Sequence, residues 1–314
     1  MKTPTSLIEA VRYFSDLAVC NDYMKRIKWP DGTPTCPHCS SERLGEITTR
    51  ALLRCKDCRK QFSYKVGTIF EDSPLGLDKW FVAVWAIANC RNGISSYELA
   101  RALGVTQKTG WFMLHRIREA MKSRTFTKLS GTVESDETFI GGKAENMHKA
   151  RREKVIRGRG AVGKIIVQGV LERAGDVRCE VIPSTDGPTV QGTIVRHVQQ
   201  GATVYTDGHE GYRDLWTRFV HDTVDHATEY VRGVVHTNGI ENFWSLLKRS
   251  IRGTYIVMSV MHLARYLDEQ AFRFNRRHGD DFERFLAALQ GTIGRRLTYR
   301  RLCQRDDCGF MGKA

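Results

Sequence analysis

Three acidic side chains stand where they could hold metal ions for phosphodiester chemistry: Asp136 in VESDETF, Asp207 in VYTDG and Glu241 in HTNGIENFW. Cutting a phosphodiester requires an activated oxygen nucleophile and a stabilised leaving oxygen, and two divalent ions about 3.5–4 Å apart can supply both. Mg²⁺ and Mn²⁺ prefer carboxylate oxygens as ligands. Lys248 follows Glu241 by two helical turns and could contact a phosphate from the same helix face. These four residues are the predicted catalytic group, and the three acids are the predicted ligands of two catalytic ions.

Each acid taken alone also has a structural interpretation. Asp207 followed by Gly208 is a common turn signal. Asn238 followed three residues later by Glu241 is typical of a helix N-cap with its supporting glutamate. Only the combination of two strand carboxylates with one helix carboxylate indicates a shared metal site.

The segments around these acids predict an α/β domain with a mixed sheet over about residues 130–277. In the segment around Asp136, the side chains of Glu134, Asp136 and Thr138 should point to one face of a strand. Around Glu241, a stripe of apolar residues marks the packing face of a helix. The expected strands are TVESDETFIGG, KIIVQGVLER, VRCEVIP and ATVYTDG, with the helical segment TVQGTIVRHVQQ between the third and the fourth.

A second chemical signature is a set of four cysteines, Cys36, Cys39, Cys55 and Cys58, in two C-x2-C pairs. This spacing is typical of four thiolates that bind one tetrahedral zinc ion. Two disulfides are the alternative that the spacing leaves open. The chain has nine cysteines, of which one would stay unpaired, and its first residues lack the apolar core of a signal peptide. We therefore favour a structural zinc ribbon over residues 31–70, ending in a strand with alternating Phe62, Tyr64 and Val66.

Residues 75–125 predict a helix-turn-helix domain. After a first helix in LDKWFVAVWAIANC, Ser95 or Ser96 should cap a short helix with Glu98 in support, Gly104 should end it, and Thr106 should cap a second, basic helix. A helical hairpin without a DNA-binding role is the alternative. The DNA contacts expected from the second helix are Lys108, His115, Arg116 and Arg118.

The charge of the chain favours a polyanionic partner. Forty-nine Lys and Arg against thirty-five Asp and Glu give a net charge of +14, and the pI is near 9.5. Such a balance raises the local concentration of DNA or RNA. A basic loop between the first two strands and the end of the Glu241 helix add the expected DNA contacts Arg151, Arg152, Lys154, Lys248 and Arg249. No stretch has the length of a membrane span, which predicts a cytoplasmic protein without a membrane partner.

The remaining divisions follow from the periodicity of apolar residues. Residues 1–30 should be helical, with apolar residues recurring at Leu7, Ile8, Val11, Phe14 and Leu17. Residues 278–314 are expected to form a separate C-terminal helical tail, in which Cys303 and Cys308 are free thiols.

The order of these motifs resembles the DDE transposases of bacterial insertion sequences, specifically the zinc-ribbon, ISXO-like group. The resemblance covers about residues 10–277 and implies an RNase H-like catalytic fold. It also implies Mg²⁺-dependent cleavage at the ends of an element, with the freed 3′-hydroxyl then attacking target DNA. The segments that carry it, after the paired cysteines, are GISSYELARALGVTQKTGWFMLHRIREAM, VESDETFIGGK, VYTDGHEGY, HTNGIENFWSLLKR and YLDEQAFRFNRR.

The resemblance assigns the acids to Asp136, Asp207 and Glu241, with Lys248 as the downstream basic partner. Related groups carry Asn or another residue at the third position, so Asn238, Asp268 and Glu269 remain alternatives to Glu241. We prefer Glu241 because its place on the helix and its distance to Lys248 suit a site that holds both metal and phosphate.

The leading hypothesis is therefore a transposase that binds terminal inverted repeats as a dimer or higher oligomer, cleaves and joins DNA, and is associated with the nucleoid. A zinc-containing DNA-binding regulator with an inert α/β domain would share the charge, the ribbon and the helix-turn-helix. A non-transposing RNase H-like nuclease would cleave without joining ends. Only the acids distinguish a transposase from the DNA-binding regulator, and only the joining of ends distinguishes it from the nuclease.

Overall fold

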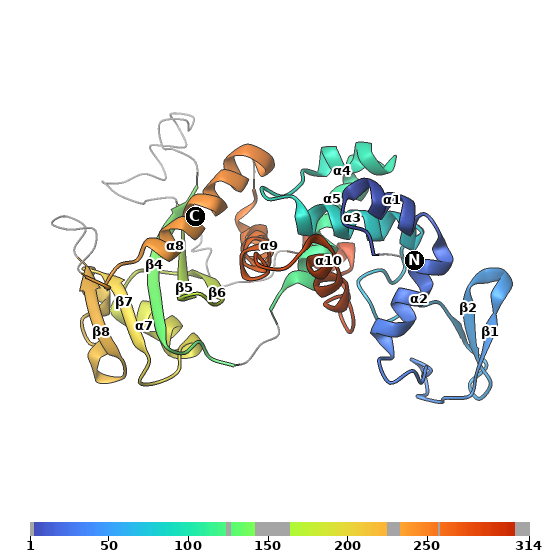
Figure 1. Cartoon of the computed structure of the whole chain (residues 1–314), viewed down its shortest axis with the longest axis horizontal. Helices are drawn as coiled ribbons and strands as arrows, with labels where there is room; N and C mark the ends of the chain where they lie inside the picture. The colour runs from blue at the N-terminus through green and yellow to red at the C-terminus, as the bar shows by residue number, and fades with distance from the viewer. Residues whose placement is uncertain (1–2, 124–126, 142–163, 225–232, 257, 305–314) are drawn as a thin grey trace. The chain divides into compact units, whose positions relative to one another are not determined.

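The computed structural model describes residues 3–123, 127–141, 164–224, 233–256 and 258–304. These residues form two compact units (Figure 1). The first unit combines Met1–Ser123 with Arg276–Asp306, and the second contains Arg124–Asn275. The segment expected to be a separate C-terminal tail therefore belongs largely to the N-terminal unit.

The first unit is mainly helical and closes around an aromatic core. The ring of Phe285, which is fully buried, lies 4.8 Å from the ring of Phe14 and 5.6 Å from those of Phe81 and Trp85. The predicted helices around Phe14 and Phe81 are thus confirmed, and the core is completed from the distant C-terminal segment. The helices are α1 (Leu7–Phe14), α2 (Leu17–Lys28), α3 (Leu77–Asn89), α4 (Ser96–Leu103), α5 (Gln107–Met121), α10 (Asp281–Gln290) and α11 (Tyr299–Cys303).

The predicted capping residues of α4 and α5 are confirmed. Ser95 and Glu98 form a capping box at the start of α4, because each side chain accepts a hydrogen bond from the other residue's backbone N–H. Gly104 ends α4 in the left-handed region at φ 63°, where a side chain would be strained. The side chain of Thr106 then accepts from Thr109 N and starts α5. These signals produce the helical hairpin directly from local sequence.

The cysteine-containing segment forms a small antiparallel sheet in the order β1-β2-β3. The predicted strand through Tyr64 and Val66 is wrong beyond Phe62, because the chain turns there to reach the C-terminal segment. Ile69 N donates to Thr292 O at 3.3 Å, so the chain pairs with residues that the local pattern could not reveal. The strands are β1 (Leu44–Ile47), β2 (Leu52–Cys55) and β3 (Gln61–Phe62), with a 3-10 turn η1 (Thr48–Arg50) between β1 and β2.

The second unit is built on a five-stranded mixed sheet in the order β6-β5-β4-β7-β8. β5 runs antiparallel to β4 and β6, whereas β4, β7 and β8 are parallel. The predicted α/β class and the four expected strands are confirmed, and β8 is an additional edge strand that the sequence analysis did not predict. The strands are β4 (Thr132–Ile140), β5 (Ile165–Glu172), β6 (Val177–Ile182), β7 (Thr203–Asp207) and β8 (Val220–Val224).

Helices cover both faces of this sheet (Figure 1). Helix α7 (Gly187–His197) packs Val190 and Ile194 against one face, which includes Val133 and Val204 of the sheet. Helices α8 (Asn238–Ser250) and α9 (Leu263–Asn275) form a separate apolar core on the other face, with Phe243 of α8 buried in it. Short irregular turns complete the unit: η3 (Glu210–Tyr212), η4 (Leu215–Thr217), the π-helical η5 (Ile251–Tyr255) and η6 (Val260–His262).

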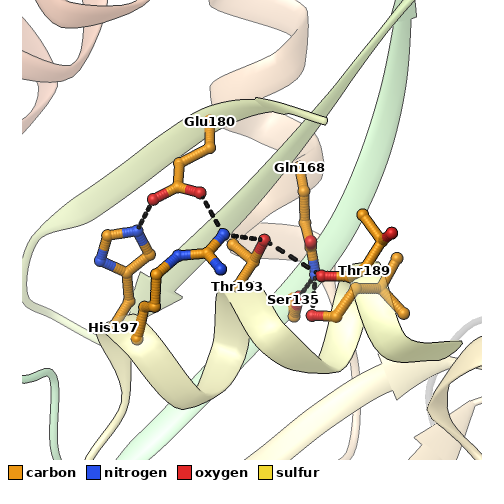
Figure 2. A network of polar contacts seen from close by, with 8 residues as sticks. Ser135, Gln168, Glu180, Thr189, Thr193 and His197 are labelled. Atoms are coloured by element: carbon orange, nitrogen blue, oxygen red, sulfur yellow. Dashed lines mark hydrogen bonds and ion pairs between the residues drawn. The ribbon is translucent and has the colours of Figure 1, made fainter. Parts of the chain in front are cut away.

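Polar contacts fix α7 to the sheet at two points (Figure 2). At the end of α7, Glu180 of β6 forms 2.5 Å contacts with both Arg196 and His197. The hydrogen bond from His197, with Arg196 in support, lowers the pKa of Glu180 to about 2. At the start of α7, the buried amide of Gln168 donates to Val190 O at 3.1 Å and to Ser135 Oγ at 3.2 Å. The orientation of α7 is thus fixed by hydrogen bonds as well as by packing.

Among the described residues, none of the helices combines the length and the apolar character that crossing a membrane would require.

Candidate active site and zinc centre

Asp136 and Asp207 lie at the same level on neighbouring strands. The last paired residues of the parallel β4 and β7 are Glu134 and Tyr205, and each aspartate follows two residues later on its strand. Because side chains on a strand alternate between faces, Asp136 shares a face with Glu134, and Asp207 shares one with Tyr205. The sheet therefore brings together two acids that are seventy-one positions apart in the sequence.

The face that carries both aspartates is the one that α8 covers. The buried carboxylate of Glu134 accepts a hydrogen bond from Ile240 N of α8 at 3.0 Å. Two residues further along β4, Asp136 Oδ2 accepts from the indole Nε1 of Trp244 at 3.0 Å. Valines 133 and 204 point to the opposite face, toward α7. The predicted alternation of Glu134, Asp136 and Thr138 on one face agrees with these contacts.

Trp244 occupies a place that only a glycine on the sheet allows. Asp136 pairs across the sheet with Gly169 of β5. A Cβ atom on Gly169 would lie 2.7 Å from two ring carbons of Trp244 and 2.8 Å from Ile240 Cδ1. The missing side chain therefore leaves room for the indole beside Asp136, which is a close approach that glycine permits. Sequence reasoning did not assign a role to either Gly169 or Trp244.

Glu241 is exposed in the first turn of α8, and the hydroxyl of Thr237 donates to its Oε1 at 3.1 Å. Burial raises the pKa of Asp136 to about 6, and the negative charges of Asp207 and Glu241 contribute to this shift. The three predicted metal ligands are thus close enough to interact electrostatically. Among the described residues, their oxygens do not all lie within 4.8 Å of one another, as the sulfurs of the four ribbon cysteines do.

This donor set suits a divalent ion. Carboxylate oxygens are the preferred ligands of Mg²⁺ and Mn²⁺. Burial first, and then the charges of Asp207 and Glu241, raise the pKa of Asp136, so the ionised carboxylate is disfavoured at this position. A bound cation would remove that cost by favouring the ionised carboxylates. Asp136, Asp207 and Glu241 are the residues that would hold it.

The alternatives for the third acid are placed differently. Glu269 is fully buried and accepts hydrogen bonds from Arg273 and Tyr255, so its carboxylate is already compensated. The charge of Asp268 acts on Cys179 of β6, which is at the other edge of the sheet from β8 and two strands away from β4. Asn238 is the exposed first residue of α8.

The N-cap interpretation of Asn238 and Glu241 is wrong. Thr237 occupies the cap position of α8, and no side chain forms a capping hydrogen bond there. Glu241 is therefore not needed as the partner of a capping asparagine.

A buried ion pair positions the start of α8. Arg173 Nε donates to Glu134 Oε1 at 2.9 Å, and its two other nitrogens donate to Val234 O at 2.8 Å and His236 O at 2.9 Å. The guanidinium also lies 4.7 Å from the centre of the Tyr205 ring. One arginine thus connects β4, β7 and the segment that leads into α8. The sequence showed only that Glu134 shares the face of Asp136.

On the α7 side of the sheet, Glu137 faces away from the three acids. Tyr212 donates a hydrogen bond to it, and burial together with the charges of Asp136 and Asp207 raises the pKa of Glu137 to about 8. The buried position therefore favours the neutral form of Glu137.

The four cysteines meet as the spacing predicts. The Sγ atoms of Cys36 and Cys58 are 3.6 Å apart, and those of Cys39 and Cys55 are 3.5 Å apart. A disulfide would bring two sulfurs to about 2.05 Å, whereas four sulfurs bound at about 2.3 Å from one zinc ion would be separated by about 3.8 Å. The disulfide alternative is therefore wrong, and the cluster fits structural zinc.

Backbone N–H groups support this cluster. His38 N donates to Cys36 Sγ at 3.4 Å, and Cys58 N donates to Cys55 Sγ at 3.5 Å. Such bonds favour the thiolate form that binds metal. Cys36 and Cys55 are buried, so the metal would link β2 to the first cysteine turn from within the ribbon.

Replacing Cys55 with serine should abolish stoichiometric zinc binding and unfold the ribbon, because a small domain of this kind depends on its metal for folding energy. Metal analysis of the purified protein should give one zinc per chain for the wild type. Cys303→Ser, at an exposed cysteine of α11, is the matched control and should keep its zinc. Full zinc retention in Cys55→Ser would contradict the assignment.

The predicted DNA contacts on α5 divide into two groups. Lys108 is exposed, whereas His115, Arg116 and Arg118 are 0, 4 and 1% exposed. Arg116 donates to Glu71 O at 2.5 Å and burial lowers its pKa to about 10. These three side chains lie inside the helical unit and have no surface to offer DNA, so they are removed from the predicted interface. Their spacing on the helix did not show which face would be covered.

The other predicted contacts lie in the second unit or outside the described residues. Lys248 is half-buried and Arg249 is exposed, both in the last turn of α8. Arg151, Arg152 and Lys154 lie outside the described residues.

Comparison with known proteins identifies the family. Residues 128–275 match the ISXO2-like transposase domain, and residues 16–61 match the transposase zinc-ribbon domain. An uncharacterized protein in the transposable element ISH50 of Halobacterium salinarum is 31% identical over 240 residues, which is 72% of this chain and 80% of that protein. This chain belongs to the ISXO2-like transposases. No solved structure matches it.

The matched regions of the transposase coincide with the two sites. Asp136, Asp207 and Glu241 all fall within the transposase domain, and the four cysteines fall within the zinc ribbon. The resemblance drawn from the motifs is thus confirmed at the level of the family.

Proposed function

We propose that this transposase binds the terminal inverted repeats of an insertion sequence and catalyses metal-dependent cleavage and transfer of DNA strands. The observation that carries the proposal is the meeting of Asp136 and Asp207 on neighbouring parallel strands, beneath the helix that carries Glu241. The sheet, in which β5 runs antiparallel to the other four strands, supports an RNase H-like fold.

In the proposed mechanism, Asp136, Asp207 and Glu241 would hold two divalent ions, whose chemistry would be to activate an oxygen nucleophile and to stabilise the leaving oxygen. Asp136 is oriented by the indole of Trp244, and the α8 backbone is held by Glu134. Lys248, two turns beyond Glu241, is proposed to contact a phosphate near the reacting bond.

The N-terminal unit is proposed to hold the DNA. The zinc ribbon and the α4–α5 hairpin would contact duplex ends, and the excess of basic residues would make this binding depend steeply on salt. Because two element ends must be joined, we propose that the protein works as a dimer or a higher oligomer, at the nucleoid in the cytoplasm.

The test is a cleavage and joining assay with Mg²⁺ or Mn²⁺ on a labelled duplex that carries the element's terminal repeat. Asp207→Asn and Glu241→Gln should each lower the rate by more than about a thousandfold, because they remove metal ligands. Glu210→Gln is the matched control, since Glu210 lies three residues after Asp207, is exposed and forms an ion pair with the exposed Arg213.

The outcomes separate the alternatives. Duplex binding without cleavage by the wild type would indicate a regulator, and cleavage without joining would indicate a nuclease. A normal rate in Glu241→Gln combined with a loss in Asn238→Ala or Asp268→Asn would show that the third acid is wrongly assigned.

A further inference from the structure

Only the first turns of α5 are available to a ligand. Gln107 and Lys108 are exposed, and Trp111 and Phe112 are half-exposed. From Met113 to Arg118 every side chain of the helix is buried. In helix-turn-helix proteins the N-terminal residues of the second helix are the ones that reach the bases. Any DNA contact made by α5 must therefore involve its start.

The C-terminal helix α11 lies directly beside this exposed start. The ring of Tyr299 is 5.6 Å from the ring of Phe112 and 6.4 Å from that of Trp111, and Lys108 Nζ lies 4.9 Å above the Tyr299 ring. Leu297 and Leu302, on either side of Tyr299, are each only 2% exposed. The contacts of Tyr299 thus place α11 against α5, and the buried leucines on either side of it fix α11 within the unit.

The helix that carries Tyr299 also carries additional positive charge. Arg300 and Arg301 follow Tyr299 and are both exposed. Among the described residues, Lys108, Arg300 and Arg301 form no ion pair, whereas the neighbouring Arg296 contacts Glu71 and Asp72. Three exposed cations on two contacting helices, without ion pairs of this kind, attract a polyanion.

We propose that α11 is part of the DNA-binding surface, and that Arg300 and Arg301 contact phosphates of the duplex whose bases face the start of α5. Phosphate contacts from a flanking element fix the orientation of a reading helix without reading sequence. The proposal rests on the proposed function, since it assigns a DNA contact to a segment that lies outside the matched transposase and ribbon regions.

The experiment measures binding of the full-length, zinc-loaded protein to a fluorescent 30-base-pair duplex over a series of salt concentrations. The double variant Arg300→Ala/Arg301→Ala should bind several-fold more weakly on every duplex sequence. Losing two phosphate contacts should reduce the slope of log affinity against log salt by about 2. Arg12→Ala/Lys25→Ala, exposed on α1 and α2, removes the same charge elsewhere and should leave the slope unchanged.

A second variant tests the geometry without changing the charge. Tyr299→Ala keeps both arginines but removes the contact with Trp111 and Phe112, so it should also weaken binding. Normal affinity and slope in the arginine double variant would overturn the proposal. Tighter binding in that variant would also overturn it, because α11 would then cover the surface instead of extending it. If the wild type bound no duplex at all, the proposed function would fail first.

Discussion

Replacing Asp136 with asparagine should abolish strand cleavage and at the same time stabilise the metal-free protein. The wild-type carboxyl has its pKa raised to about 6 from an ordinary value of 3.8, mainly by burial and by the charge of Asp207. A folded-state pKa above the unfolded value means that the ionised form costs stability once the pH exceeds both values. Asparagine cannot ionise and removes this cost, but it also removes a metal ligand.

The sign of the pH dependence can be checked directly. The stability that the protonated Asp136 carboxyl leaves to the wild type should be present at pH 4 and lost as the pH rises through 6. The gain in stability of Asp136→Asn over the wild type should therefore be small at pH 4 and complete above pH 6. A pKa shift of about two units corresponds to a change of at most about 3 kcal/mol in the free energy of unfolding. Thermal melting of the metal-free protein from pH 4 to 8 measures it.

Metal should reverse the order of stability. Saturating Mn²⁺ should raise the melting temperature of the wild type but not that of Asp136→Asn, because an ion that binds only the folded protein stabilises it. If Asp136→Asn were less stable than the wild type without metal, or kept its cleavage rate, the predicted role of Asp136 would be wrong.

Replacing Gly169 with alanine should destabilise the second unit and slow cleavage. The added Cβ would lie 2.7 Å from the ring of Trp244 and 2.8 Å from Ile240 Cδ1, so α8 would have to move away from the sheet. Such overpacking costs about 1–3 kcal/mol. Because α8 carries both Trp244 and Glu241, a displacement of about 1 Å should lower the rate about a hundredfold. Chemical denaturation and the cleavage assay measure the two effects.

Two further variants separate packing from hydrogen bonding. Gly253→Ala is the matched control, since no atom lies within 4 Å of its added Cβ and its φ is not positive. Trp244→Phe keeps an aromatic ring on Gly169 but removes the N–H that lowers the pKa of Asp136, so it should fold, and its Asp136 should titrate at higher pH. Unchanged stability in Gly169→Ala would contradict the close packing.

Much of the site could be predicted because its signals are local. The alternation of VESDETF placed Asp136 and Glu134 on one face, and a cysteine spacing with its own chemistry placed the zinc cluster. Ser95, Gly104 and Thr106 set the ends of α4 and α5 through hydrogen bonds within a few residues. Features of this kind depend on residues that are close to one another in the sequence.

The features that were missed depend on distant partners. β8 has the short, half-polar sequence VHDTV, which becomes a strand because β7 lies beside it. His115, Arg116 and Arg118 occur in a basic stretch, but residues from outside the helix bury them. The role of Gly169 is likewise visible only when Trp244, seventy-five positions later, is in place.

The return of residues 276–306 to the first unit makes the second unit an insertion within the first. A fragment that stops at residue 123 would lack Phe285 and leave a hole among Phe14, Phe81 and Trp85. Isolating the first unit by truncation at residue 123 should therefore yield an unstable product. Joining residue 123 to residue 276 through a short linker should instead retain the complete aromatic core.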